Sequence, residues 1–270
     1  MKLTLSPTAV RIDASEPSAN KSPPVAFLAN VAQPVANLCH KAAALCQQIA
    51  PHDLTGLPLY ILPQSAIAAE LGNADSTYGY TMEWLDWVLR DQIGDAWRGR
   101  GPCIVVNDIA MSQDLGDFIE PSFLATTIHE LAHVFERDMR FDTVPNISSD
   151  RVLFERLRLA HEVREPVPES ERTQTFHQHD QRFIRAVLHL RFRADRYGAL
   201  LARSLILNDG PAIFARPIDY ELALQNEPER MFDVSLRDIM ANAPPPAFSR
   251  LWAAELEFLT RHSHFSKETK

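Results

Sequence analysis

The segment TTIHELAHVFE, residues 126–136, constrains the fold of this chain more than any other part of it. Its two histidines, His129 and His133, are four residues apart, so on an α-helix their side chains lie one turn apart on one face. Two imidazoles in that arrangement can bind one metal ion at about 2.0–2.1 Å each. Glu130 then points beside the ion, where a carboxylate can act as a general base. The segment therefore predicts a helix with two zinc ligands and one catalytic carboxylate.

The residues around this motif have the pattern of a helix that lines a cleft. Four apolar residues repeat with helical spacing and form a stripe for the core, namely Leu124, Ile128, Leu131 and Phe135. The two histidines fall on nearly the opposite face of the helical wheel, and Glu130 is the charged residue between them. A chance match of five residues is the alternative. The uncharged, helical context favours the metal-binding interpretation.

A catalytic zinc site needs a third protein ligand and an open position for water. The segment HQHDQRF, residues 177–183, supplies His179 at the start of a predicted helix whose apolar stripe is Phe183, Val187, Leu190 and Ala194. His179 falls near that stripe and points inward, so we predict that it is the third ligand. The alternatives are His177 and a carboxylate, with Glu155 and Glu162 as candidates.

His189 falls on the other side of the same predicted helix, among the arginines Arg182, Arg185, Arg193 and Arg196. A helix face rich in arginine is usually solvated and forms ion pairs with acidic residues. We therefore predict that His189 and these arginines lie at the surface.

Helix signals dominate the chain and strand signals are few. Short strands are predicted at 57–63 and 102–110, the second rich in β-branched residues. Helices are predicted at 81–92, from Pro121 through the motif, at 150–165 and at 180–205, with more after 217. The predicted fold class is α+β, mostly helical, with a small sheet packed on the motif helix. The predicted domains are a flexible tail at 1–24, a metal-binding domain at 25–215 and a C-terminal helical extension at 216–270.

Composition limits which binding partners and which cellular compartment are expected for this chain. The 270 residues include 35 acidic and 27 basic ones, for a net charge of −8, which disfavours direct nucleic-acid binding. The three cysteines, Cys39, Cys46 and Cys103, form no disulfide framework and no Cys-x-x-Cys pair. No apolar run has the length of a signal core or a membrane span. We therefore expect a soluble, cytoplasmic protein with no membrane partner.

HELAH followed well downstream by HDQRF resembles the SprT-like zinc metallopeptidases, whose pattern is His-Glu-x-x-His and then His-Gly-x-x-Phe. The resemblance covers these two motifs, and Asp180 stands where the family usually has Gly. It implies a zincin-like domain at 25–215 with Zn2+ as the cofactor. By the same resemblance, His129, His133 and His179 would be the ligands and Glu130 the base.

The first functional hypothesis is a zinc-dependent peptidase that hydrolyses a peptide or protein substrate through a metal-activated water, with Glu130 as general base. In it, residues 103–108 would form an edge strand that pairs with an extended substrate. An oxyanion donor would come from Tyr80, Tyr197 or Tyr220. The second hypothesis is a non-catalytic zinc scaffold that acts through protein–protein interaction, with a fourth ligand from the loop 165–175. The third has no metal at all.

Overall fold

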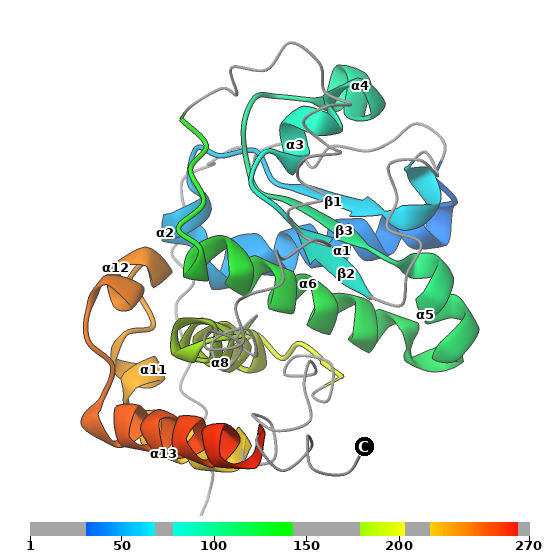
Figure 1. Cartoon of the computed structure of the whole chain (residues 1–270). Coiled ribbons are helices and arrows are strands. Elements are labelled where there is room, and N and C mark those ends of the chain that lie inside the picture. The colour runs from blue at the N-terminus through cyan, green and yellow to red at the C-terminus, as the bar shows by residue number, and fades with distance from the viewer. Residues whose placement is uncertain (1–30, 68–77, 143–178, 203–216, 264–270) are drawn as a thin grey trace, which may run out of the picture.

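The computed structural model describes residues 31–67, 78–142, 179–202 and 217–263, with the side chains of the last segment described from 218 to 257 (Figure 1). Helices dominate these segments and surround one small sheet, which confirms the α+β, mostly helical class. Among the described residues, no helix combines the length and apolar character that crossing a membrane requires.

The sheet has three strands in the order β1-β3-β2, with bounds β1 Tyr60–Pro63, β2 Gly79–Thr81 and β3 Cys103–Val106. Strand β1 runs parallel to β3, and β2 runs antiparallel to it. The prediction that 103–108 forms an edge strand is wrong, because β3 lies in the centre. Strands β1 and β2 form the two edges, and the three residues of β2 are too short a run for the sequence to have indicated a strand.

Two clusters of apolar side chains cover the two faces of the sheet. On one face, Ile61 and Ile104 pack against α1 (Gln33–Ile49) and α6 (Ile119–Glu136). On the other, Tyr60 and Val105 pack against the short helices α3 (Leu85–Val88) and α4 (Arg90–Ile93). Burial on both faces explains why β3 is a continuous apolar run without alternation.

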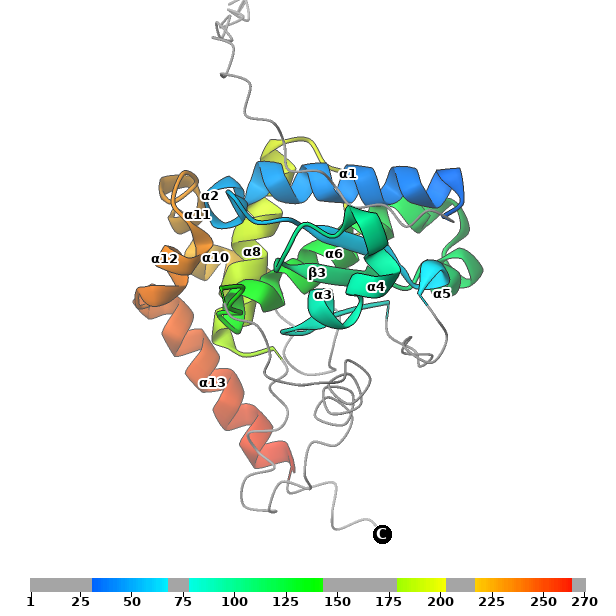
Figure 2. The ribbon, with the colours of Figure 1, turned by 90° about the horizontal axis from the view of Figure 1, so that it is seen from above.

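Helix α6 lies between the sheet and α8 (Gln181–Arg196) in Figure 1, and the view from above in Figure 2 shows α8 running across the direction of α1. The motif helix begins two residues before Pro121, close to the prediction. Helix α8 ends at Arg196, earlier than predicted, because Gly198 adopts a φ of 73° and closes the helix end. The single helix predicted at 81–92 is instead strand β2 followed by α3 and α4. The helix predicted at 150–165 lies outside the described residues.

The remaining helices complete the shell around the core. They are α2 Pro51–Leu54, α5 Asp108–Asp114, α10 Pro217–Leu224, α11 Glu227–Arg230, α12 Leu236–Ala241 and α13 Pro246–Ser263, with 3₁₀ turns at Gln64–Ala66, Gly94–Ala96 and Gly116–Phe118. Leu236 and Phe248 belong to the same apolar cluster as α6. The buried carboxylate of Asp53 accepts hydrogen bonds from the backbone amides of Leu236 (2.8 Å) and Arg237 (3.1 Å). The C-terminal helices therefore share the core of the sheet-bearing region.

The prediction of a solvated arginine face on α8 is wrong for its central residues. Arg185, His189 and Arg193 are 3%, 0% and 1% exposed. Arg185 forms an ion pair with Glu227 of α11 and donates to the carbonyl of Asn242 (2.7 Å). A helical wheel separates the two faces of α8, but it does not show that a distant part of the chain covers the polar face. At the end of the helix, Arg196 is exposed and pairs with an acidic residue, as predicted.

Candidate metal centre

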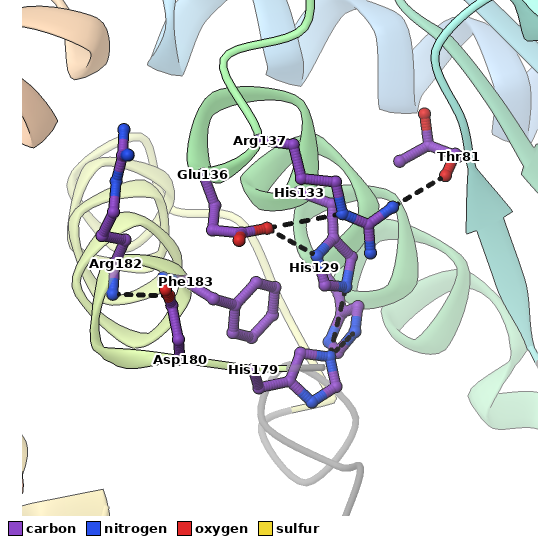
Figure 3. A network of polar contacts seen from close by, with 9 residues as sticks. All are labelled: Thr81, His129, His133, Glu136, Arg137, His179, Asp180, Arg182 and Phe183. Carbon is purple, nitrogen blue, oxygen red and sulfur yellow. Dashed lines mark hydrogen bonds and ion pairs between the residues drawn. The ribbon is translucent and has the colours of Figure 1, made fainter. Parts of the chain in front are cut away.

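Three histidines converge at the place where α6 meets the start of α8 (Figure 3). His129 and His133 project from α6, and His179 lies two residues before α8 begins. The Nε2 atom of His179 is 3.2 Å from Nε2 of His129 and 3.2 Å from Nε2 of His133. All three side chains are buried, and their ligand atoms lie within 4.8 Å of one another. The structure thus brings the three predicted ligands together.

The two separations of 3.2 Å from His179 fit a tetrahedral ion. Zinc–nitrogen bonds of about 2.0–2.1 Å at tetrahedral angles place two nitrogens roughly 3.3–3.4 Å apart. Hydrogen bonds among the rings are a poorer explanation, because a neutral imidazole nitrogen carries either one proton or one lone pair. The single Nε2 of His179 faces two other nitrogens and cannot bond well to both. Imidazole ligands suit zinc, copper, iron and nickel, and three histidines are one known ligand set of catalytic zinc sites.

Helix α6 presents two of these ligands because its other faces are anchored in the core. The apolar stripe predicted from the sequence is buried, with Leu124 7% exposed and Ile128, Leu131 and Phe135 at 1% or less. Every residue from Ser122 to Phe135 is buried. The helix is therefore enclosed on all sides, and its histidines sit in a low-dielectric environment that strengthens electrostatic interactions.

Asp180 and Phe183 build the other wall of the site. The carboxylate of Asp180 caps α8 by accepting hydrogen bonds from the amides of Arg182 (2.7 Å) and Phe183 (2.9 Å). Its φ is −78°, so the backbone at this position does not require the glycine of the family pattern. The ring of Phe183 lies 4.2 Å from that of His179 and 4.4 Å from that of His133, measured between centroids. Phe183, predicted only as a core residue, therefore forms an apolar support for the imidazoles.

Strand β2 passes beside Glu130, and Gly79 makes this possible. A Cβ atom at Gly79 would lie 3.2 Å from Cγ of Glu130 and only 2.5 Å from Cγ2 of Thr126. A residue with a side chain would therefore displace the strand from α6. Glu130 itself is 6% exposed and lies on the same turn of α6 as His129. No sequence pattern singled out Gly79.

A second carboxylate lies behind the histidines. Oε2 of Glu136 is 3.4 Å from Nδ1 of His133 and 3.4 Å from Nε of Arg137. Arg137 also donates from Nη1 to the carbonyl oxygen of Thr81 on β2 (3.3 Å), as Figure 3 shows. Burial raises the pKa of Glu136 to about 7, Asp180 adds to the increase, and Arg137 opposes it. The sequence analysis missed Glu136, although its spacing of three from His133 places both on one helix face.

The other candidates for the site lie elsewhere. His177, Glu155, Glu162 and the loop 165–175 fall outside the described residues. Tyr80 packs in the cluster on the far face of the sheet from α6. Tyr197 is half exposed at the opposite end of α8 from His179, and the hydroxyl of Tyr220 donates to Glu255 (2.6 Å). An oxyanion donor from these tyrosines therefore stays a prediction without support from their positions.

Comparison with known proteins does not assign this chain to a group. No family model matches it, and neither a curated protein nor a solved structure does.

Proposed function

We propose that this chain is a zinc-dependent peptidase whose zincin-like domain contains helix α6, the three-stranded sheet and the start of α8. The observation that carries the proposal is the convergence of three buried imidazole nitrogens. Glu130 follows the ligand His129 directly on α6 and supplies a carboxylate beside them. The sequence resemblance to SprT-like metallopeptidases rests on the same residues and supports the same function.

Each of these residues has one task in the proposed reaction. His129, His133 and His179 would hold the metal through Nε2. When bound, zinc supplies Lewis acidity that polarises a carbonyl and makes water acidic enough to lose a proton near pH 7. Glu130 accepts the proton of the attacking water and returns it to the departing amine. Phe183 excludes water from the ligand side of the site and keeps the imidazoles in position.

The edge strand β2 is the proposed place for an extended substrate. Because the amide of Asn107 donates to the carbonyl of Tyr78 (2.8 Å), the antiparallel alternation directs the polar backbone groups of Gly79 and Thr81 away from β3. A peptide strand can add to this edge through main-chain hydrogen bonds. At Gly79 it would pass directly beside Glu130. The carbonyl of Thr81 already accepts from Arg137, so pairing would centre on Gly79.

The alternative is a structural zinc site in a scaffold that acts through protein–protein interaction. A structural site has four protein ligands, whereas a catalytic one has three and an open position. Among the residues that the structure describes, the cluster consists of the three histidines alone. The fourth ligand of the scaffold hypothesis was predicted in the loop 165–175, so zinc content and chelator-sensitive cleavage have to separate the two proposals.

Metal content and activity, measured together, test the proposal. We expect about one zinc per chain and chelator-sensitive cleavage of an unstructured protein such as casein. Glu130→Gln should keep its zinc and lose about 10²–10⁴-fold in turnover, as expected for loss of a general base. Glu120→Gln is the matched control, because Glu120 lies on the same helix in an exposed ion pair with Lys41. Full activity of Glu130→Gln, or no zinc in the wild-type chain, would refute the proposal.

A further inference from the structure

A continuous series of polar contacts joins one metal-site histidine to the edge of the sheet. It runs from Nδ1 of His133 to Glu136, from Glu136 to Arg137, and from Arg137 to the carbonyl of Thr81 (Figure 3). Glu136 is the last residue of α6, and Arg137 caps that helix. The series therefore links the end of the motif helix to the strand proposed to bind substrate.

We propose that Glu136 is a positioning residue for His133, and that Arg137 is the clamp that holds Glu136 and ties it to β2. The inference rests on the proposed zinc site, because it concerns how one of its ligands is held. Neither residue contacts the reacting atoms, so both act through His133.

The position of Glu136 determines which nitrogen of His133 is available. Nε2 of His133 faces His179, so Nδ1 is the nitrogen that faces the carboxylate. In its ionised form the Glu136 carboxylate only accepts hydrogen bonds, and this form favours the tautomer of His133 with the proton on Nδ1. That tautomer leaves the lone pair of Nε2 directed at the centre of the three histidines. Ligating histidines usually donate their second N–H to a carboxylate or carbonyl, which fixes the ring and raises its basicity.

Arg137 explains why Glu136 remains beside His133. The Glu136 side chain is only 16% exposed, and a buried carboxylate is costly unless it is paired. Nε of Arg137 approaches Oε2, the same oxygen that faces His133. The guanidinium is held in turn by the carbonyl of Thr81, which points away from β3. A displacement of β2 would therefore move Arg137 and, through it, the carboxylate that orients His133.

Zinc affinity of the full-length chain, measured by competition with a chromogenic chelator, tests this inference. Glu136→Ala should bind zinc about 10–100-fold more weakly than the wild type, the usual cost of losing an outer-shell partner. Glu136→Gln keeps a carbonyl acceptor and should recover part of the affinity. Arg137→Ala should have a smaller effect, and the double variant should be no weaker than Glu136→Ala, because Arg137 acts through Glu136. Glu120→Gln should bind as the wild type does.

A cobalt-substituted sample separates positioning from a general structural role. The visible spectrum of Co2+ depends on ligand geometry, so Glu136→Ala should change it while the metal-free variant keeps the wild-type circular dichroism. If Glu136→Ala does not fold, the isosteric Glu136→Gln carries the same comparison. Wild-type affinity in Glu136→Ala, or fully additive losses in the double variant, would overturn this inference and leave the proposed function intact. A wild-type chain that does not bind zinc would overturn both.

Discussion

Helix α8 and the residue just before its N-cap contribute histidines to two buried polar clusters that differ in how their charges are balanced. At its start, His179 meets two histidines of α6, and the three nitrogens face one point. In its middle, His189 lies beside the ion pair of Arg185 and Glu227. The first cluster contains no carboxylate among its converging atoms, whereas the second is balanced by its own acidic residue.

This difference shows that burial of a histidine does not by itself indicate a ligand. His189 is fully buried, and its Nε2 lies 3.5 Å from Oε2 of Glu227. Burial lowers its pKa, and Glu227 opposes that change. What marks the other cluster as a candidate metal site is the convergence of several nitrogens at the spacing of a tetrahedral ion.

The largest expected effect separates the two clusters by metal binding. His179→Ala should weaken zinc binding by more than about 100-fold, since even an outer-shell change costs about 10–100-fold. His189→Ala is the matched control, because it removes a buried histidine of α8 outside the three-histidine cluster, and it should retain its zinc. Metal analysis of both purified variants measures the difference. Equal zinc content in the two would remove the distinction between the clusters.

Breaking the ion pair of the second cluster should lower the free energy of unfolding without changing metal binding at the first. Glu227→Ala leaves the buried Arg185 guanidinium without its carboxylate, so the free energy of unfolding should fall by about 3–5 kcal/mol. Zinc content of the folded variant should stay unchanged. Glu229→Ala removes an exposed partner of Arg196 and should cost less than about 1 kcal/mol. Urea denaturation of the zinc-loaded proteins checks the order, and a larger loss in Glu229→Ala would contradict it.

Disturbing the close approach of β2 to α6 should affect the site at the three-histidine cluster and leave the His189 cluster unchanged. Gly79→Ala places a Cβ 2.5 Å from Cγ2 of Thr126, and overpacking of this kind costs about 1–3 kcal/mol. Casein cleavage should fall because the strand moves away from Glu130, and zinc affinity should fall less than in Glu136→Ala, because the displaced strand also shifts Arg137. Adding Thr126→Ser removes the clashing methyl group and should restore part of both stability and cleavage. A neutral Gly79→Ala, or no recovery in the double variant, would argue against this packing.

The sequence predicted the three-histidine cluster better than it predicted the core around it. His129, His133 and His179 could be found because helical spacing is a local property and the third histidine begins a helix with an inward-facing stripe. The buried state of Arg185 and His189 could not be found, because Glu227 and Asn242 reach them from more than thirty residues downstream. A polar helix face has the same sequence pattern whether water or a distant helix covers it.

Strand β2 and its contacts could not be predicted from the sequence, for a related reason. Three residues give no periodicity, and the central place of β3 depends on pairing with segments on both sides of it along the chain. The importance of Gly79 follows only from its distance to Thr126 and Glu130, which lie far away in sequence. Glu136 is the exception, since its spacing from His133 was visible in the motif helix.

The smallest expected effect is a difference in acid sensitivity between the clusters. Because burial lowers the pKa of His189 below that of an unfolded histidine, about 6.5, the unfolded chain binds more protons there. The stability that His189 contributes is therefore present above pH 6.5 or so and is lost as the pH falls through its folded pKa. Burial alone would raise the pKa of Glu227, but hydrogen bonds from His189 and Arg185 outweigh burial and lower it. The stability that Glu227 contributes is therefore lost only at lower pH, below about 4.3.

His189→Gln isolates the first of these two steps. Urea denaturation of the metal-free wild type and of His189→Gln, compared at each pH from about 8 to 5, cancels the titration of the metal-site histidines, which both proteins share. The difference in unfolding free energy should shrink or reverse as the pH falls, because only the wild type must keep a neutral imidazole beside Arg185. A difference that is constant with pH would mean that His189 does not titrate in this range and that its cluster responds to acid through Glu227 alone.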